Sequence, residues 1–235
     1  MNYFYHPRLD NSVSQFSFSP EESKHIVKVL RKQEGDELKI TNGKGYLFTA
    51  KITIADPKRC TGQVLDTKKS IPPRSELHLA VAPTKRLDRF QWFLEKATEI
   101  GVSEVTPIIC EHSERKKLST ERLSRVMQEA MKQSLRTYLP RLNEPVPYPE
   151  FLKREHPKFR FIAHCEKDEK LDLKRRVAAD KDVLVLIGPE GDFSRAEIQA
   201  AYDQGFLPVS LGESRLRTET AALVACVTVN LINSG

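Results

Sequence analysis

The amino-acid sequence predicts an α/β protein of two domains: a small β-rich N-terminal domain, and a larger C-terminal domain built on a parallel sheet. Three observations support this prediction. Beyond residue 74, apolar strand patterns alternate with amphipathic helix patterns, which is typical of a parallel sheet covered on both faces. Pro72 and Pro73 interrupt any regular element before that pattern begins. Glycine-bearing loops follow two later strands. We expect domains at 1–72 and 73–235.

The N-terminal domain is expected to contain one helix and several strands. Ser19 and Pro20 mark the helix start, and Glu22 would complete a capping box, with the helix running to about Lys32. A short strand at 38–40 and a glycine turn at 42–45 follow. Apolar residues then alternate from residue 46 to 54, as in a half-buried strand.

The C-terminal domain is expected to alternate strands and helices. The strands are predicted at 77–82, 105–109, 159–164, 183–187 and 207–211. The helices are predicted at 88–100, 120–138, 194–204 and from about 218 to near the end of the chain. Gly101 and Pro140 are expected to end the first two helices, and Ser194 with Glu197 forms a capping box that starts the third.

The composition excludes several classes of protein. Hydrophobic residues make up 39% of the 235 residues, without an apolar run long enough to span a bilayer. Residues 1–8 show no export signal, so we expect a soluble, cytoplasmic protein. The four cysteines are scattered, and the six histidines lack ligand spacing. We therefore predict buried, reduced thiols and no metal.

The net charge of +6 is concentrated at the front of the chain. Residues 1–74 carry 13 Lys and Arg against 8 Asp and Glu, whereas the remaining residues carry 25 against 24. A basic module favours a polyanionic partner such as nucleic acid, because Lys and Arg displace counterions from phosphates. An ordinary solvated surface is the alternative.

Two loops of the C-terminal domain are candidates for ligand binding. Gly188-Pro189-Glu190-Gly191 lies between a buried strand and a helix start, and a second loop runs from Leu211 through Gly212 into the last helix. Helix N-termini expose unpaired N–H groups, and glycine lets a ligand approach the main chain, although a simple tight turn would show the same residues. The usual dinucleotide and phosphate-loop motifs are absent. Glu190 and Asp192 disfavour a triphosphate and favour an adenosine ligand that carries a cation.

At these loops the sequence resembles the ribosomal RNA small-subunit methyltransferase E family, knotted methyltransferases of the SPOUT class. The resemblance covers nearly the whole chain, and four groups of residues carry it: 25–31 with Gly35-Asp36; 95–102 with 133–136; 188–191 with 193–194; and 216–221. Two departures stand out: Asp192 replaces a second glycine, and Ser214-Arg215 replaces an arginine followed by a branched apolar residue. The second departure makes Arg215 doubtful as an equivalent contact, but not Arg217.

The resemblance implies a fold, a cofactor and a reaction. The fold would be an N-terminal PUA-like β-barrel and a C-terminal SPOUT domain with a parallel sheet and a deep trefoil knot. The reaction would be methylation of N3 of a uridine in 16S ribosomal RNA, with S-adenosylmethionine as cofactor, by a homodimer. The cofactor contacts would be made largely by backbone groups, at Ile187, Gly188, Pro189, Gly191, Leu211, Gly212, Leu216, Arg217 and Thr218.

Candidate catalytic residues follow from the chemistry that such a transfer requires. Uridine N3 must lose its proton, and negative charge on the base carbonyls must be stabilised. Arg217 is the first candidate for that second task and Arg136 the next, with a salt bridge at a helix end as the alternative for each. Glu190 is either a base or a brace of the loop. Glu219 is equally ambiguous, because an acid in a first helical turn is favoured in any case.

The expected partners are RNA and a second copy of the chain. The candidate RNA-binding residues are Arg8, Lys24, Lys28, Arg31, Lys32 and Arg115. The apolar last helix, 221–232, is either a dimer interface or core. Two other functions stay open at this point: a non-catalytic RNA-binding protein, and a knotted methyltransferase that acts on transfer RNA or on a ribose hydroxyl.

Overall fold

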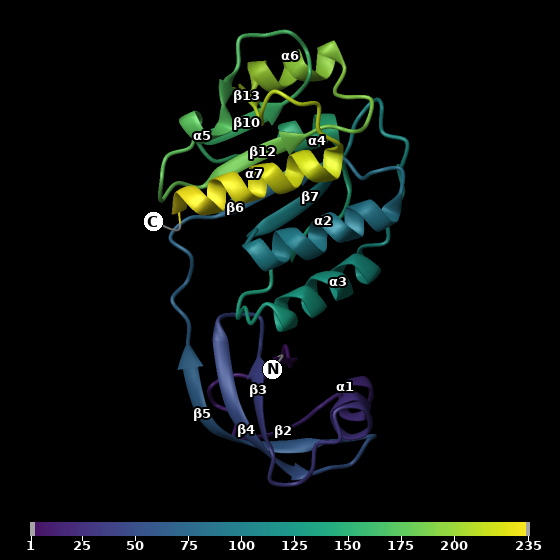
Figure 1. Ribbon diagram of the computed structural model, residues 1–235, viewed down its shortest axis with the longest axis vertical. Helices are drawn as coiled ribbons and strands as arrows, with labels where there is room; N and C mark the ends of the chain where they lie inside the picture. The colour runs from purple at the N-terminus through teal and green to yellow at the C-terminus, as the bar shows by residue number, and fades with distance from the viewer. Residues whose placement is uncertain (1–2, 234–235) are drawn as a thin grey trace. The chain divides into compact units, whose positions relative to one another are not determined.

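The computed structural model describes residues 3–233, which divide into two compact units (Figure 1). The first unit comprises the residues up to Pro72 together with Gln128–Leu139. The second comprises Pro73–Met127 and the residues from Pro140 onward. The first unit therefore includes a segment that lies within the expected 73–235 domain.

The first unit is built on a curled five-stranded sheet of order β1-β3-β4-β5-β2. Its strands are β1 (Phe4–Tyr5), β2 (Gln15–Ser17), β3 (Glu37–Thr41), β4 (Tyr46–Ile54) and β5 (Thr61–Lys69). All pairings are antiparallel except β1 with β3. Alternate residues of β4, including Phe48, Ala50 and Ile52, are buried in the core of this unit, as the sequence pattern predicted. This is the expected PUA-like module.

The helix of this unit differs from the prediction. Helix α1 (Pro20–Lys24) passes into a π-helical turn, η1 (His25–Val29). Ser19 Oγ accepts the Glu22 N–H at 3.3 Å, as expected of a cap. The Glu22 carboxylate does not complete a capping box, because its Oε1 lies 3.5 Å from Lys132 Nζ. The sequence interpretation overlooked this partner, which is 110 positions away in the chain.

Helix α3 (Thr120–Gln133) is shorter than expected. The prediction carried it to Tyr138, but the chain turns at Leu135, whose φ is 58°. The residues that follow join the first unit: Gly45 N donates to Thr137 O at 2.9 Å, and Leu139 N donates to Gly43 O at 2.9 Å. Pairing with the glycine turn replaces the last helical turn.

The second unit contains a parallel sheet of order β11-β13-β10-β12-β6-β7-β8, with β9 beside β7. The strands are β6 (Leu77–Val81), β7 (Glu104–Ile109), β8 (Arg141–Leu142), β9 (Val146–Pro147), β10 (Phe159–Ala163), β11 (Leu171–Asp172), β12 (Val183–Ile187) and β13 (Leu207–Ser210). Every pairing is parallel. The predicted sheet is confirmed, and β12 has the predicted bounds.

Helices cover both faces of this sheet. They are α2 (Leu87–Ile100), α4 (Tyr148–Leu152), α5 (Leu173–Arg176), α6 (Arg195–Asp203) and α7 (Thr218–Asn233). Helices α4 and α6 pack on the face that carries Leu184 and Leu186, while α2 and α7 pack together on the other. After β13, near one edge, the chain returns to place α7 on β6 and β12 at the centre. A trefoil knot requires such a return.

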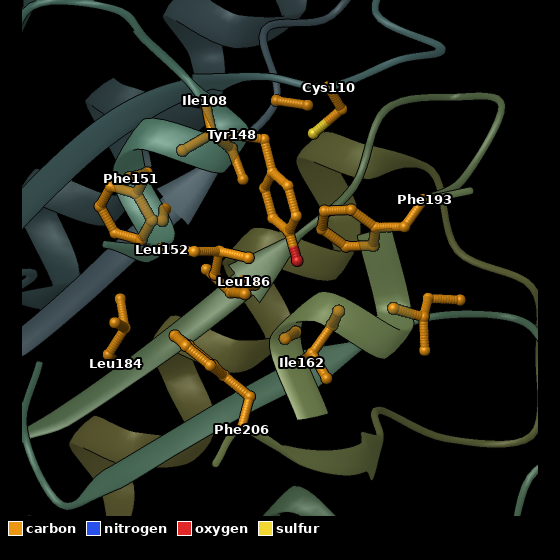
Figure 2. Close-up of a cluster of buried hydrophobic side chains, with 14 of the residues drawn as sticks. Ile108, Cys110, Tyr148, Phe151, Leu152, Ile162, Leu184, Leu186, Phe193 and Phe206 are labelled. Carbon is orange, nitrogen blue, oxygen red and sulfur yellow. The ribbon is translucent and has the colours of Figure 1, made fainter. Parts of the chain in front are cut away.

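Aromatic residues fill the core under α4 and α6. Figure 2 shows the Tyr148 and Phe193 rings side by side in this cluster, with centroids 5.3 Å apart. Tyr148 also donates from its hydroxyl to Glu197 O at 3.0 Å. Because its ring packs on Tyr148, Phe193 anchors the loop between β12 and α6 in the core.

Within residues 3–233, no helix is both long enough and apolar enough to cross a membrane.

Candidate functional site

A cavity of about 720 Å³ lies beyond the carboxyl ends of β10, β12 and β13. Three chain segments form its walls: the residues after β10, the loop after β12, and the loop between β13 and α7. Ligands of parallel α/β sheets bind at this end of the strands. The volume falls within the range of small-molecule sites.

Eight of the nine predicted cofactor-binding residues line this cavity. They are Ile187, Gly188, Pro189, Leu211, Gly212, Leu216, Arg217 and Thr218. The lining does not include Gly191, which lies against His112. The two loops that the sequence singled out therefore meet at one site.

The structure shows what surrounds each glycine of the two loops. A Cβ at Gly188 would lie 3.0 Å from ring carbons of Phe193, and one at Gly191 would lie 3.0 Å from His112 Cβ. Both glycines thus permit close packing within the protein. Gly212 alone of the three faces open space, with φ at 130°, a conformation that side chains disfavour.

Thr218 joins the two loops. Its Oγ1 donates to Gly188 O at 3.0 Å, and the residue is buried at the first position of α7. The Thr218 hydroxyl therefore fixes the loop after β12. The predicted capping box of α6 is confirmed, because Glu197 N donates to Ser194 Oγ and Ser194 N donates to Glu197 Oε2.

The two predicted catalytic residues of this unit have different surroundings. Arg217 is exposed and lines the cavity. Glu190 lines it too, but its Oε1 accepts the Lys85 N–H at 2.9 Å. Arg115 holds the same segment as well, donating through Nη2 to Lys85 O at 2.7 Å. Glu190 and Arg115 both brace the loop after β6.

Glu219, the ambiguous acid, is buried in the first turn of α7 with its Oε1 3.8 Å from Arg89 Nε. The third predicted catalytic residue, Arg136, belongs to the first unit.

Several cavity residues were not predicted as site residues, and Cys165, Lys170 and Asp192 are three of them. Cys165 follows β10 and is exposed, so the expectation that every cysteine is buried is wrong for this one. Lys170 donates from Nζ to His164 O and Glu166 O, both at 2.6 Å, and so closes the loop after β10. Asp192 accepts the Cys165 N–H at 2.7 Å. The signal available for Asp192 was an Asx residue directly after a glycine turn.

Comparison with known proteins places the chain in a family. The model of an RNA methyltransferase domain matches residues 72–230, and that of an RNA methyltransferase PUA domain matches residues 18–65. Ribosomal RNA small subunit methyltransferase E of Buchnera aphidicola (subspecies Acyrthosiphon pisum) is 30% identical over 224 residues, which cover 92% of this chain and 88% of the relative. The chain belongs to the ribosomal RNA small subunit methyltransferase E family.

Solved structures agree with this assignment to the methyltransferase E family. A probable rRNA methyltransferase from Porphyromonas gingivalis is 42% identical, with a TM-score of 0.92 and coverage of 100% of this chain and 99% of that one. The methyltransferase E of Neisseria gonorrhoeae, solved bound to S-adenosylmethionine, is 25% identical, with a TM-score of 0.88 and coverage of 99% and 98%.

The predicted RNA-binding residues of this methyltransferase E family member fall in both units. Arg8, Lys24, Lys28 and Arg31 are exposed on the first unit, where Lys32 Nζ lies 3.9 Å from Asp36 Oδ2. Arg115, in the second unit, is half-buried by its contacts with the loop after β6. Over the described residues, no group of three or more His, Cys, Asp and Glu is arranged to hold a metal.

Proposed function

We propose that this protein transfers a methyl group from S-adenosylmethionine to N3 of one uridine in 16S ribosomal RNA. The observation that carries the proposal is the convergence of both predicted loops on one cavity, in a chain of the methyltransferase E family. The expected domain 1–72 would recognise the RNA, and the expected domain 73–235 would transfer the methyl group.

The residues present fit this cofactor. The cavity offers apolar side chains at Ile187, Leu211 and Leu216 and open backbone at Gly212, which suit an adenosine moiety. It also carries both signs of charge: Glu190 and Glu213 suit a sulfonium and an ammonium, and cationic side chains suit a carboxylate. When bound, S-adenosylmethionine would supply an electrophilic methyl group and leave as S-adenosylhomocysteine, while the N3 proton of the uridine passes to solvent.

The chain's own residues would position the base. Arg217, exposed at the cavity, would orient the uridine and stabilise the negative charge that develops on its carbonyl oxygens once N3 has lost its proton. Arg136 would contribute to RNA contacts from the first unit. Glu190 would keep the loop after β6 in place through Lys85 N rather than accept the proton.

Methyl transfer to small ribosomal subunits by an Arg217→Ala variant tests this role. We expect S-adenosylmethionine affinity to be retained and transfer to fall by at least about a hundredfold, as for the loss of one group that stabilises developing charge. Arg195→Ala is the control, since the Arg195 side chain is 88% exposed on α6. Normal turnover of Arg217→Ala would refute the proposed role.

The modified atom separates the rival functions. Mass mapping of RNA from a deletion strain should show loss of one N3-methyluridine in 16S RNA. If the methyl group lost in the deletion strain is instead one of transfer RNA or of a ribose hydroxyl, the protein is another kind of knotted methyltransferase. A non-catalytic RNA-binding protein would show no thermal stabilisation by S-adenosylmethionine, which a native state that binds the cofactor must show.

We further propose that the protein acts in the cytoplasm as a homodimer through α7. One face of this helix, including Ala222, Cys226 and Val229, is core, but Val227 is 36% exposed and Leu231 is 70% exposed. Trp92, on the neighbouring helix α2, is 44% exposed. Light scattering should report a dimer for the wild type and a monomer for Leu231→Glu. A monomeric wild type would contradict the proposal.

A further inference from the structure

Asp192 adopts a backbone conformation that residues with a side chain rarely adopt. Its φ is 63°, in the left-handed region, directly after the Gly188–Gly191 loop. Aspartate tolerates this region better than most residues, because its short side chain can hydrogen-bond to nearby backbone. The conformation is locked by Asp192 N, which donates to Pro189 O at 3.0 Å.

Both carboxylate oxygens of Asp192 accept main-chain hydrogen bonds. Oδ1 accepts the N–H of Phe193 at 2.8 Å, and Oδ2 accepts the N–H of Cys165 at 2.7 Å. The backbone oxygen of Asp192 also lies 3.0 Å from His112 Nδ1. Hydrogen bonds to an ionised acceptor are short and strong. The carboxylate therefore holds the backbone of two segments in place.

The bond to Cys165 joins two walls of the cavity. The pairing of β10 with β12 ends at Ala163 and Ile187, and Asp192 continues the connection to Cys165, two residues further along. Cys165 lies in one wall, and Asp192 lies at the end of the loop that forms the next. The Asp192 carboxylate thus ties these two walls together beyond the end of the strand pairing.

We propose that Asp192 is a positioning residue that preforms the cavity for S-adenosylmethionine. It acts through Cys165 N and Phe193 N, and its own carboxylate need not touch the cofactor. The inference rests on the proposed function, because it assigns the cavity to that cofactor. A preformed cavity binds more tightly, because less order has to be imposed when the ligand enters.

Two substitutions separate this role from relief of backbone strain. Asp192→Gly removes both hydrogen bonds but suits the left-handed backbone, so strain alone predicts a neutral or stabilising change. Asp192→Asn keeps the shape but offers one acceptor oxygen for two N–H groups. A positioning role predicts that cofactor affinity falls in the order Asp, Asn, Gly.

Asp180→Gly is the matched control. Asp180 also has a left-handed φ, of 56°, but it does not line the cavity, and its Oδ2 lies 3.8 Å from Arg74 Nη1. Calorimetry should give the Kd for S-adenosylmethionine of the full chain and of each variant. Steady-state transfer to small ribosomal subunits should give KM for each substrate.

The expected result is a rise in Kd and KM for S-adenosylmethionine of about tenfold or more in Asp192→Gly, the scale of one lost hydrogen bond to a charged group. Asp192→Asn should be intermediate. KM for the RNA substrate should stay at the wild-type value in both variants, and Asp180→Gly should change neither constant. If Asp192→Gly does not fold, the isosteric Asp192→Asn carries the test.

A second readout is the reactivity of the Cys165 thiol. Partial desolvation of this exposed residue, and then the charge of Asp192, raise the pKa of its thiol. At a fixed pH, Cys165 should therefore be alkylated faster in the Asp192→Asn variant than in the wild type.

Unchanged cofactor affinity in both Asp192 variants, with a wild type that binds, would overturn the positioning role alone. A wild type that binds no S-adenosylmethionine would overturn the proposed function as well.

Discussion

Gly188→Ala adds one methyl group where the loop after β12 packs on the Phe193 ring. The new Cβ would lie 3.0 Å from Phe193 Cδ2 and Cε2 and 3.2 Å from Phe193 N. The ring is only 4% exposed and lies against Tyr148, so it cannot swing away freely. Overpacking of this kind costs about 1–3 kcal/mol. For a chain of this length each kcal/mol lowers Tm by roughly 2–4 °C, so Tm should fall by roughly 2–12 °C.

Calorimetry of the single and double variants measures the effect and its cause. Phe193→Leu leaves space for the added methyl group, so the pair Gly188→Ala and Phe193→Leu should lose less stability than the two changes summed, by about 0.5–3 kcal/mol. Gly212→Ala is the control: its Cβ would face open space, and its cost, from φ at 130°, should add to that of Phe193→Leu. Additivity in the Gly188 pair would refute the packing argument. The larger Gly188→Val change should abolish S-adenosylmethionine binding, and unchanged calorimetric affinity would contradict this.

Two further predictions concern titratable side chains of the second unit. Burial lowers the pKa of His78 from 6.5 to about 4, beside Glu104 and with Thr106 Oγ1 2.7 Å from Nε2. His78 binds a proton more readily in the unfolded chain than in the folded protein. The stability that neutral His78 contributes is therefore complete above pH 6.5, and about 3 kcal/mol of it is lost as the pH falls towards 4. Denaturation between pH 7 and 4 should show a shallower loss in His78→Gln, and parallel pH profiles would contradict this. S-adenosylmethionine should protect Cys165, the exposed cysteine at the cavity, from alkylation, and equal labelling rates with and without the cofactor would argue against binding there.

Local patterns predicted the longer elements of the second unit, but not the short strands β8, β9 and β11 or the short helices α4 and α5. The apolar run of β12 and the capping box at Ser194 are complete within a few residues of sequence, so periodicity and capping chemistry were sufficient. The meeting of the two glycine loops was also predictable, because both follow strands of one parallel sheet.

Contacts between distant residues set the limit of the sequence interpretation. Glu22 pairs with Lys132, and Thr218 donates to Gly188. Neither partner could be predicted, because it lies far away in the sequence. The packing role of Gly188 was not predictable either, because it depends on where the Phe193 ring lies. Asp192 was noticed for its charge and as a departure from the family pattern, but its contact with Cys165 was not predicted, because Cys165 is 27 residues earlier in the chain.

The segment Gln128–Leu139 has a consequence for dividing this protein into fragments. The chain passes between the two units near residue 72, again near residue 127 and once more near residue 139. A fragment that ends at residue 72 would lack the N–H of Leu139 and the carbonyl of Thr137, which complete the turn at Gly43 and Gly45. The complementary fragment would carry those residues without their partners. A cut at Pro72 therefore separates the sequence into two pieces without separating it into two folding units.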